Sequence, residues 1–149
     1  MSDDTVDKIS KTPKENSCKL NPVDILIVDD IHANVYLIES MLSDKFTVAS
    51  AESSEQIWVK LKVNPPRLVL LDIMMPFENG FQVLDKMKKN EAYMSIPVIV
   101  VSAKDSKDDV MKALSLGAVD YITKPIKEEV LIGKICKVLK IDPSKFDDE

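Results

Sequence analysis

The stretch LVLLDIMMPFENG, residues 68–80, decides the fold of this chain. Four aliphatic residues run directly into one carboxylate, Asp72, and two methionines, a proline and a glycine follow. A short, wholly apolar run bounded by turn residues is typical of a strand covered on both faces of a parallel sheet. Ligands of such sheets bind at the carboxyl ends of the strands. Asp72 is therefore the first candidate for a functional residue.

Similar apolar runs alternate with amphipathic segments along the rest of the chain. The predicted strands are residues 24–28, 46–50, 67–71, 97–101 and 119–122. The second and fifth runs alternate in polarity, which indicates edge strands. Between the strands, Ser53 and Gln56 have capping-box spacing, and Gly117 lies where a left-handed helix end is expected. The pattern predicts an α/β fold, a doubly wound (βα)5 flavodoxin-like sandwich with a parallel sheet of order 2-1-3-4-5.

The composition favours one domain with a real core. The chain has 149 residues, of which 45% are hydrophobic and 30% charged, and this leaves little room for a second domain. We expect a flexible polar leader at residues 1–22, the folded domain at 23–141, and a tail or the start of a linker at 142–149.

Charge and hydropathy exclude several classes of function. The net charge of -5 argues against direct nucleic-acid binding, because such binders are normally basic. No apolar run approaches the ~18 residues of a membrane span, and the amino terminus lacks the features of a signal peptide. We therefore expect a cytoplasmic protein that does not contact membranes.

Acids follow two strands that the predicted order makes neighbours. Asp29 and Asp30 follow the first strand, and Asp72 follows the third. Three carboxylates at one edge repel each other unless a cation joins them, and oxygen ligands of high charge favour Mg²⁺, with Mn²⁺ as an alternative. Each acid alone could be a helix cap or a loop solubiliser. Asp72 is the candidate nucleophile, since no cysteine or serine–histidine pair is in place.

A hydroxyl and a lysine follow the last two strands. Ser102 ends the fourth strand and could donate to the oxygen of an anion, although a helix cap is the alternative. Lys124 ends the fifth strand and suits a phosphate oxygen, although surface lysines are common in this chain. Lys124 precedes Pro125, a pair that could adopt a cis peptide bond and so aim the lysine.

Taken together, these motifs resemble the receiver domain of two-component response regulators, in particular the chemotaxis regulators. The resemblance rests on the order and spacing of four motifs: VDD (28–30), LLDIMMPFENG (70–80), VSA (101–103) and DYITKP (120–125). It implies that Asp72 accepts a phosphoryl group from a phosphohistidine. The donor would be a sensor histidine kinase or a histidine phosphotransfer protein.

The resemblance also implies a ligand set for Mg²⁺ and for the phosphoryl group. Asp29, Asp30 and Asp72 would bind the metal together with the backbone carbonyl of Met74. Ser102 and Lys124 would contact the phosphoryl oxygens, and Pro76 and Gly80 would shape the loop and the third helix beside the site.

The remaining implied roles concern switching. Tyr121 corresponds to the switch aromatic, which turns inward as the Ser102 hydroxyl moves. Met74 and Lys104 correspond to positions that tune hydrolysis of the aspartyl phosphate. The switch would change the surface formed by the fourth helix, the fifth strand and the fifth helix, through which phosphorylation-dependent homodimers form in the family. The downstream effector or output domain is not indicated.

Two other functions remain open at this point. A Mg²⁺-dependent phosphatase of haloacid-dehalogenase type would want an acid two residues after the nucleophile, where this chain has Met74. A receiver-like scaffold that takes no phosphate would not need the intact set of acids, Ser102 and Lys124. We therefore expect a signalling switch that catalyses only its own phosphorylation and dephosphorylation.

Overall fold

The computed structural model of the protein describes residues 23–75 and 79–144. The predicted leader at 1–22, Pro76 in the loop beside the candidate site, and residues 145–149 of the predicted tail lie outside the described residues. Among the described residues, no helix combines the length and the apolar composition that crossing a lipid bilayer requires.

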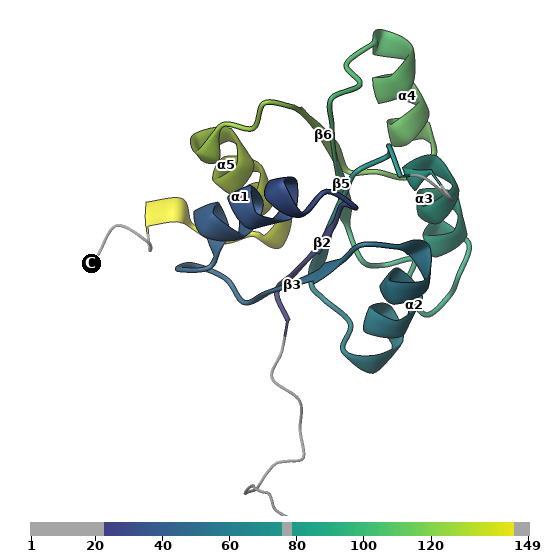
Figure 1. The fold of residues 1–149 in the computed structure, drawn as a ribbon, viewed down its shortest axis with the longest axis horizontal. Helices are drawn as coiled ribbons and strands as arrows, with labels where there is room; N and C mark the ends of the chain where they lie inside the picture. The colour runs from purple at the N-terminus through teal and green to yellow at the C-terminus, as the bar shows by residue number, and fades with distance from the viewer. Residues whose placement is uncertain (1–22, 76–78, 145–149) are drawn as a thin grey trace, which may run out of the picture.

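Five parallel strands and five helices alternate along the chain (Figure 1). The strands are β2 (Ile25–Val28), β3 (Val48–Ala51), β4 (Leu68–Leu71), β5 (Val98–Ser102) and β6 (Asp120–Thr123). The helices are α1 (His32–Leu42), α2 (Ser54–Val63), α3 (Gly80–Lys88), α4 (Lys107–Ser115) and α5 (Glu128–Leu139). The sheet order β3-β2-β4-β5-β6 is 2-1-3-4-5 in chain order, so the predicted fold, strand order and edge strands are confirmed.

The helices form two layers, one on each face of the sheet (Figure 1). Alternate strand residues enter two separate cores, because successive side chains of a strand point to opposite faces. Leu26 and Val28 pack with residues of α2, α3 and α4, whereas Ile25 and Ile27 pack with residues of α1 and α5. The three central strands are buried throughout, as their continuous apolar runs predict.

The second strand begins later than predicted. Residue 46 was expected to open it, but β3 starts at Val48. The reason is local: the Phe46 N–H donates to Leu42 O at 2.8 Å, and the Phe46 side chain is buried in the core beneath α1. Phe46 therefore closes the end of α1. The other strand boundaries agree with the prediction to within one residue.

Of the two predicted helix-terminus motifs, the capping box at Ser53 forms only in part, whereas the helix end at Gly117 forms as expected. Ser53 caps α2 by accepting the Gln56 N–H at 3.3 Å, but the Gln56 Oε1 accepts from the Glu52 N–H, so the reciprocal bond of a capping box is not made to Ser53. Gly117 has φ 112°, and Ala118 N–H donates to Ala113 O at 3.0 Å. This is the glycine-ended helix terminus that the sequence predicted for the fourth helix.

Candidate functional site

The register of the sheet brings the predicted acids to one edge. Val28 of β2 pairs with Leu71 of β4, and the next residues of the two strands are Asp29 and Asp72. The Asp72 N–H donates to Val28 O at 2.9 Å, which extends the ladder by one step. Neighbouring strands lie about 4.8 Å apart, so both carboxylates emerge side by side from the same end of the sheet.

Lys124 joins these two acids. Its Nζ lies 3.0 Å from Asp29 Oδ2 and 2.9 Å from Asp72 Oδ2. The Lys124 N–H donates to Ser102 O at 2.9 Å, so the lysine starts one residue beyond the end of β6 and reaches across β5. The Lys124–Pro125 peptide bond is cis, as the sequence suggested.

The Asp72 carboxylate is fixed at both oxygens. Oδ1 accepts the Met74 N–H at 2.9 Å, and Oδ2 accepts from the Lys124 ammonium. Burial raises the pKa of Asp72 above its ordinary value of 3.8, against the lowering effects of the Met74 N–H and of Lys124, and the charge of Asp29 raises it further. The site therefore holds a buried carboxylate whose charge depends on the neighbouring cation.

For Lys124, the hydrogen bonds and charges outweigh the effect of burial on the pKa. Burial alone would lower the pKa of Lys124, but hydrogen bonds to Asp72 and Asp29, together with their charges, raise it above 10.5. Lys124 therefore remains an ammonium throughout the neutral range. Two carboxylates share this one positive charge.

The third acid has an unmet hydrogen-bonding oxygen. Asp30 Oδ1 is buried but has no hydrogen-bond partner within the described residues. A buried carboxylate oxygen without a donor is costly, and a hard cation would satisfy it. The donor set of Asp29, Asp30 and Asp72 consists of oxygens only, which fits Mg²⁺. Across residues 23–75 and 79–144, however, no three Asp, Glu, His or Cys side chains form a group that could hold a metal ion.

Gly80 allows α3 to begin beside Asp72. A Cβ at Gly80 would lie 2.5 Å from Ile73 Cα and 2.7 Å from Asp72 O. The Gly80 N–H also donates to Ile73 O at 3.0 Å, and Asn79 forms a reciprocal capping box with Gln82. Only glycine permits this close approach of the helix to the backbone of the candidate nucleophile.

Ser102 and Tyr121 both bond to the main chain of Lys104. Ser102 is fully buried, and its Oγ accepts the Lys104 N–H at 3.1 Å. The Tyr121 hydroxyl donates to Lys104 O at 2.6 Å. Burial raises the pKa of Tyr121 above 10.0, so the hydroxyl is a donor at neutral pH. Residue 104 therefore connects the two residues for which switching was predicted, and the Ser102 side chain also acts directly on Tyr121 through a hydrogen bond that lowers its pKa.

This connection was not visible in the sequence. Lys104 was singled out for tuning hydrolysis, a role that its side chain would carry, whereas the structure shows its backbone groups as the shared partners of Ser102 and Tyr121. Main-chain groups carry no sequence signal. The joint role of Lys124 on Asp29 and Asp72 was also missed, since the sequence analysis assigned the lysine only to a phosphoryl group.

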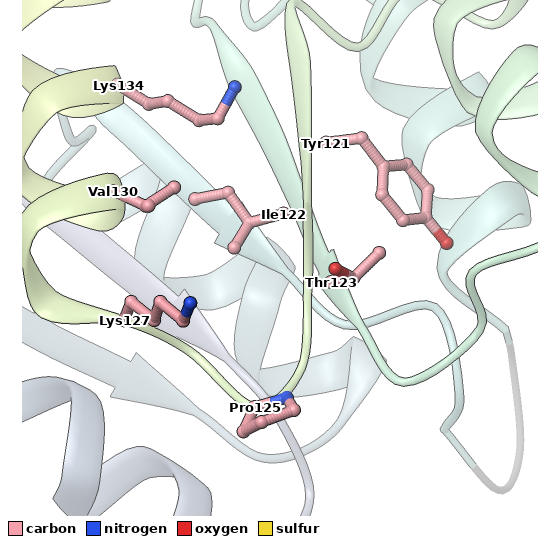
Figure 2. A pocket seen from close by; sticks show the side chains of 7 residues that line it. All are labelled: Tyr121, Ile122, Thr123, Pro125, Lys127, Val130 and Lys134. Carbon is pink, nitrogen blue, oxygen red and sulfur yellow. The ribbon is translucent and has the colours of Figure 1, made fainter.

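Figure 2 shows that successive side chains of β6 point to opposite faces of the sheet. Ile122 faces α5, whereas the Tyr121 ring points to the other side of the strand. A hollow of about 300 Å³ lies between the end of β6 and the start of α5, where Pro125, Lys127 and Val130 line it. It belongs to the surface of α4, β6 and α5, for which a switching role was predicted.

A comparison with known families decides what kind of domain this is. Residues 25–136 match the model of the response regulator receiver domain. The chain belongs to the response regulator receiver family. The match removes the phosphatase of haloacid-dehalogenase type as an alternative and identifies the chain as a receiver of two-component signalling.

Curated relatives support the same assignment. The chain is 37% identical over 112 residues to the response regulator PleD of Caulobacter vibrioides, and the alignment covers 74% of this chain and 25% of PleD. It is 39% identical over 116 residues to protein PilH of Pseudomonas aeruginosa, with 77% of this chain and 96% of PilH covered. The chain thus spans a quarter of PleD but nearly all of PilH.

Solved structures agree with the fold. A CheY-like receiver domain protein from Methanospirillum hungatei superposes with a TM-score of 0.73 at 28% identity, and the alignment covers 80% of this chain and 95% of that one. The protein is therefore a receiver by sequence and by structure.

Proposed function

We propose that this receiver accepts a phosphoryl group on Asp72 from a phosphohistidine of a sensor histidine kinase or a histidine phosphotransfer protein. The observation that carries the proposal is the Asp72 carboxylate itself: it is buried at the end of β4 and bonded to Lys124 at 2.9 Å. In the transfer, a carboxylate oxygen of Asp72 forms a bond to phosphorus while the phosphorus–nitrogen bond of the phosphohistidine breaks. The departing imidazole keeps the electron pair of that bond.

Charge neutralisation is what the surrounding residues supply. Phosphorylation adds a group of roughly -2 charge with three acceptor oxygens, and phosphoryl transfer depends mainly on positioning and electrostatic stabilisation. The Lys124 ammonium already contacts the reacting carboxylate at 2.9 Å and can neutralise charge that develops there. The Ser102 hydroxyl is at the end of the neighbouring strand and offers a donor.

We assign the Mg²⁺ site to Asp29, Asp30, Asp72 and the backbone carbonyl of Met74, with Mn²⁺ as an alternative ion. The unmet Asp30 Oδ1 and the oxygen-only donor set support this assignment. Bound Mg²⁺ supplies positive charge that neutralises the acids and the incoming phosphoryl oxygens. The fixed orientation of Asp72, set by the Met74 N–H, keeps its carboxylate aimed at this edge of the sheet.

The two bonds to Lys104 suggest how the signal leaves the site. When the Ser102 hydroxyl turns to a phosphoryl oxygen, the Lys104 N–H loses its acceptor, and the loop before α4 is released on one side. Movement of Lys104 O then breaks the 2.6 Å bond from Tyr121 and frees the ring to turn. The surface of α4, β6 and α5 changes as a result, by a two-state movement of the kind that phosphorylation biases.

Several finer assignments stay predictions. We assign Met74, whose side chain is exposed, and Lys104 to tuning the access of water to an aspartyl phosphate. Phosphorylation-dependent homodimerisation, a cytoplasmic location and the lack of nucleic-acid binding rest on the sequence and on the family resemblance. The limits 23–141 for the receiver domain are our proposal as well.

Labelling with a small phosphodonor tests the proposal. Acetyl phosphate with Mg²⁺ should add one base-labile, acid-stable phosphoryl group to the full chain, and Asp72→Asn should abolish it. Asp30→Ala should shift the Mg²⁺ dependence of labelling to higher concentration without removing the acceptor. Full labelling of Asp72→Asn would refute the assigned nucleophile, and a wild-type chain that takes no label at any Mg²⁺ concentration would favour the scaffold that takes no phosphate.

A further inference from the structure

An apolar groove lies between α2 and the beginning of the sheet. Its volume is about 240 Å³, and apolar side chains from three segments line it: Val23, Leu26, Ala49, Val59 and Val63. Lys60 and Asn64 complete the lining. Val59 and Val63 lie one helical turn apart on α2 and are 60% and 59% exposed. Cavities of roughly 150 Å³ accept a benzene-sized molecule, so this groove has room for one aliphatic side chain.

The groove is remote from the phosphorylation site. Val23 precedes β2, whereas Asp29 follows it, so the groove and the acids lie at opposite ends of the same strand. Val59 and Val63 belong to the carboxyl-terminal half of α2, which has no part in the site. An occupant of the groove would therefore leave Asp72 and Lys124 accessible.

The chain itself provides an occupant of the right kind. Val23 lines the groove and is the first residue that the structure describes, and 22 residues precede it. Leu20 is the only large aliphatic residue between residues 10 and 22. Three residues of extended chain span at most about 10 Å, a length that matches the reach needed from Val23 into the groove that it lines.

We propose that the Leu20 side chain docks in this groove and fixes the end of the leader along α2. A tethered residue needs no separate association, because the chain keeps it at high effective concentration. A second copy is a weaker candidate, since stable protein–protein contacts bury about 1,200–2,000 Å², whereas this groove accommodates a single side chain.

Accessibility of an introduced thiol tests the docking in the full chain. Val63→Cys places a thiol on the wall of the groove, and a water-soluble maleimide reports its exposure, with peptide mass spectrometry separating its product from those of Cys18 and Cys136. Docking should slow modification of residue 63 by about fivefold or more relative to the same variant carrying Leu20→Asp, since burial of a leucine provides free energy of that order. Val130→Cys is the matched control, an exposed valine position on α5, and Leu20→Asp should not change its rate.

The outcomes separate the alternatives. Equal modification rates at residue 63 with and without the Leu20→Asp substitution would overturn the proposal. Protection that grows with protein concentration would overturn it too and would assign the groove to a second copy. Protection that is independent of concentration and lost with Leu20→Asp supports it. Acetyl phosphate labelling of the same samples reports separately on Asp72, so a failure of the phosphorylation proposal would not be mistaken for a failure of this one.

Discussion

Replacing Lys124 by methionine removes the ammonium that Asp29 and Asp72 share, while most of the aliphatic stem remains to pack. The side chains of Lys124, Asp29 and Asp72 are 18%, 2% and 6% exposed, so the change leaves two buried carboxylates without their common cation. Removing one partner of a buried ion pair costs about 3–5 kcal/mol. Because water reaches part of Lys124, we expect a loss near the lower limit, about 3 kcal/mol in the free energy of unfolding at pH 7.

The stability loss in Lys124→Met should depend on pH, because Lys124 affects the pKa of Asp72. Lys124 lowers the pKa of Asp72, so its removal raises that pKa further above 3.8. The folded variant then binds more protons than the unfolded chain, and its free energy of unfolding increases as the pH falls. In the wild type, the raised pKa of Lys124 gives a contribution that is fully present below pH 10.5 and is lost as the pH rises through the raised value. Wild-type Asp72 responds in the same direction, because its pKa is raised too, but the response of the variant is larger. The difference between wild type and variant should therefore shrink from about pH 7 towards about pH 5.

Urea denaturation, followed by circular dichroism without Mg²⁺, measures the effect. Lys134→Met is the matched control, because Lys134 pairs with Asp120 at 3.0 Å but the two side chains are 33% and 30% exposed. Exposed pairs contribute about 0.2–1 kcal/mol, so this half-buried pair should contribute less than the Lys124 pairs, which water reaches less. The double variant Asp72→Asn/Lys124→Met should recover part of the loss. If Lys124→Met costs no more than Lys134→Met, or if its cost is the same at both pH values, the shared buried charge is not what stabilises this site.

The other predictions concern α3, α5 and the loop before α4. Gly80→Ala should destabilise the fold by about 2 kcal/mol or more and slow acetyl phosphate labelling, because the new Cβ overlaps the backbone at Asp72. Gly133→Ala, where no atom lies within 4 Å of the added Cβ, should instead stabilise α5 by about 0.5–1 kcal/mol in the same urea titration. Tyr121→Phe should cost about 1 kcal/mol by loss of the bond to Lys104 O. Ser102→Ala and Tyr121→Phe should be non-additive in a double-mutant cycle, and strict additivity would show that neither residue 104 nor the direct interaction of the two side chains couples them.

The sequence predicted the fold because its signals are local and repeat along the chain. Uninterrupted aliphatic runs such as Leu68–Leu71 favour buried strands when turn residues bound them, and right-handed crossovers then leave few possible sheet orders. The same reasoning placed Asp29, Asp72, Ser102 and Lys124 at one edge, since each directly follows or ends a strand. Position along a strand is thus readable without a structure.

The contacts between side chains from different strands of the site could not be predicted from the sequence pattern. Lys124 could reach an acid, a phosphoryl group or solvent, and its partners depend on distances between three strands that periodicity does not give. Phe46 illustrates the same limit for the fold, because an aromatic residue beside β-branched neighbours suggests a strand, whereas burial under α1 places it in a turn. Tertiary contacts override local preference at such positions.

The bonds at Lys104 make the Ser102 hydroxyl central to the switching that we propose. Ser102 Oγ accepts the Lys104 N–H, and the same hydroxyl has a proton to donate, which at present forms the hydrogen bond that lowers the pKa of Tyr121. A phosphoryl oxygen on Asp72 would attract that proton and, with it, the whole side chain, because a charge-assisted bond is roughly twice as strong as a neutral one. Rotation of Ser102 would then break its hydrogen bond with the Lys104 N–H. A shift of the Lys104 backbone would in turn affect Tyr121, because Lys104 O accepts the Tyr121 hydroxyl. One side-chain rotation at the proposed phosphorylation site would therefore reach β6 by two routes, through Lys104 and through the direct interaction of Ser102 with Tyr121.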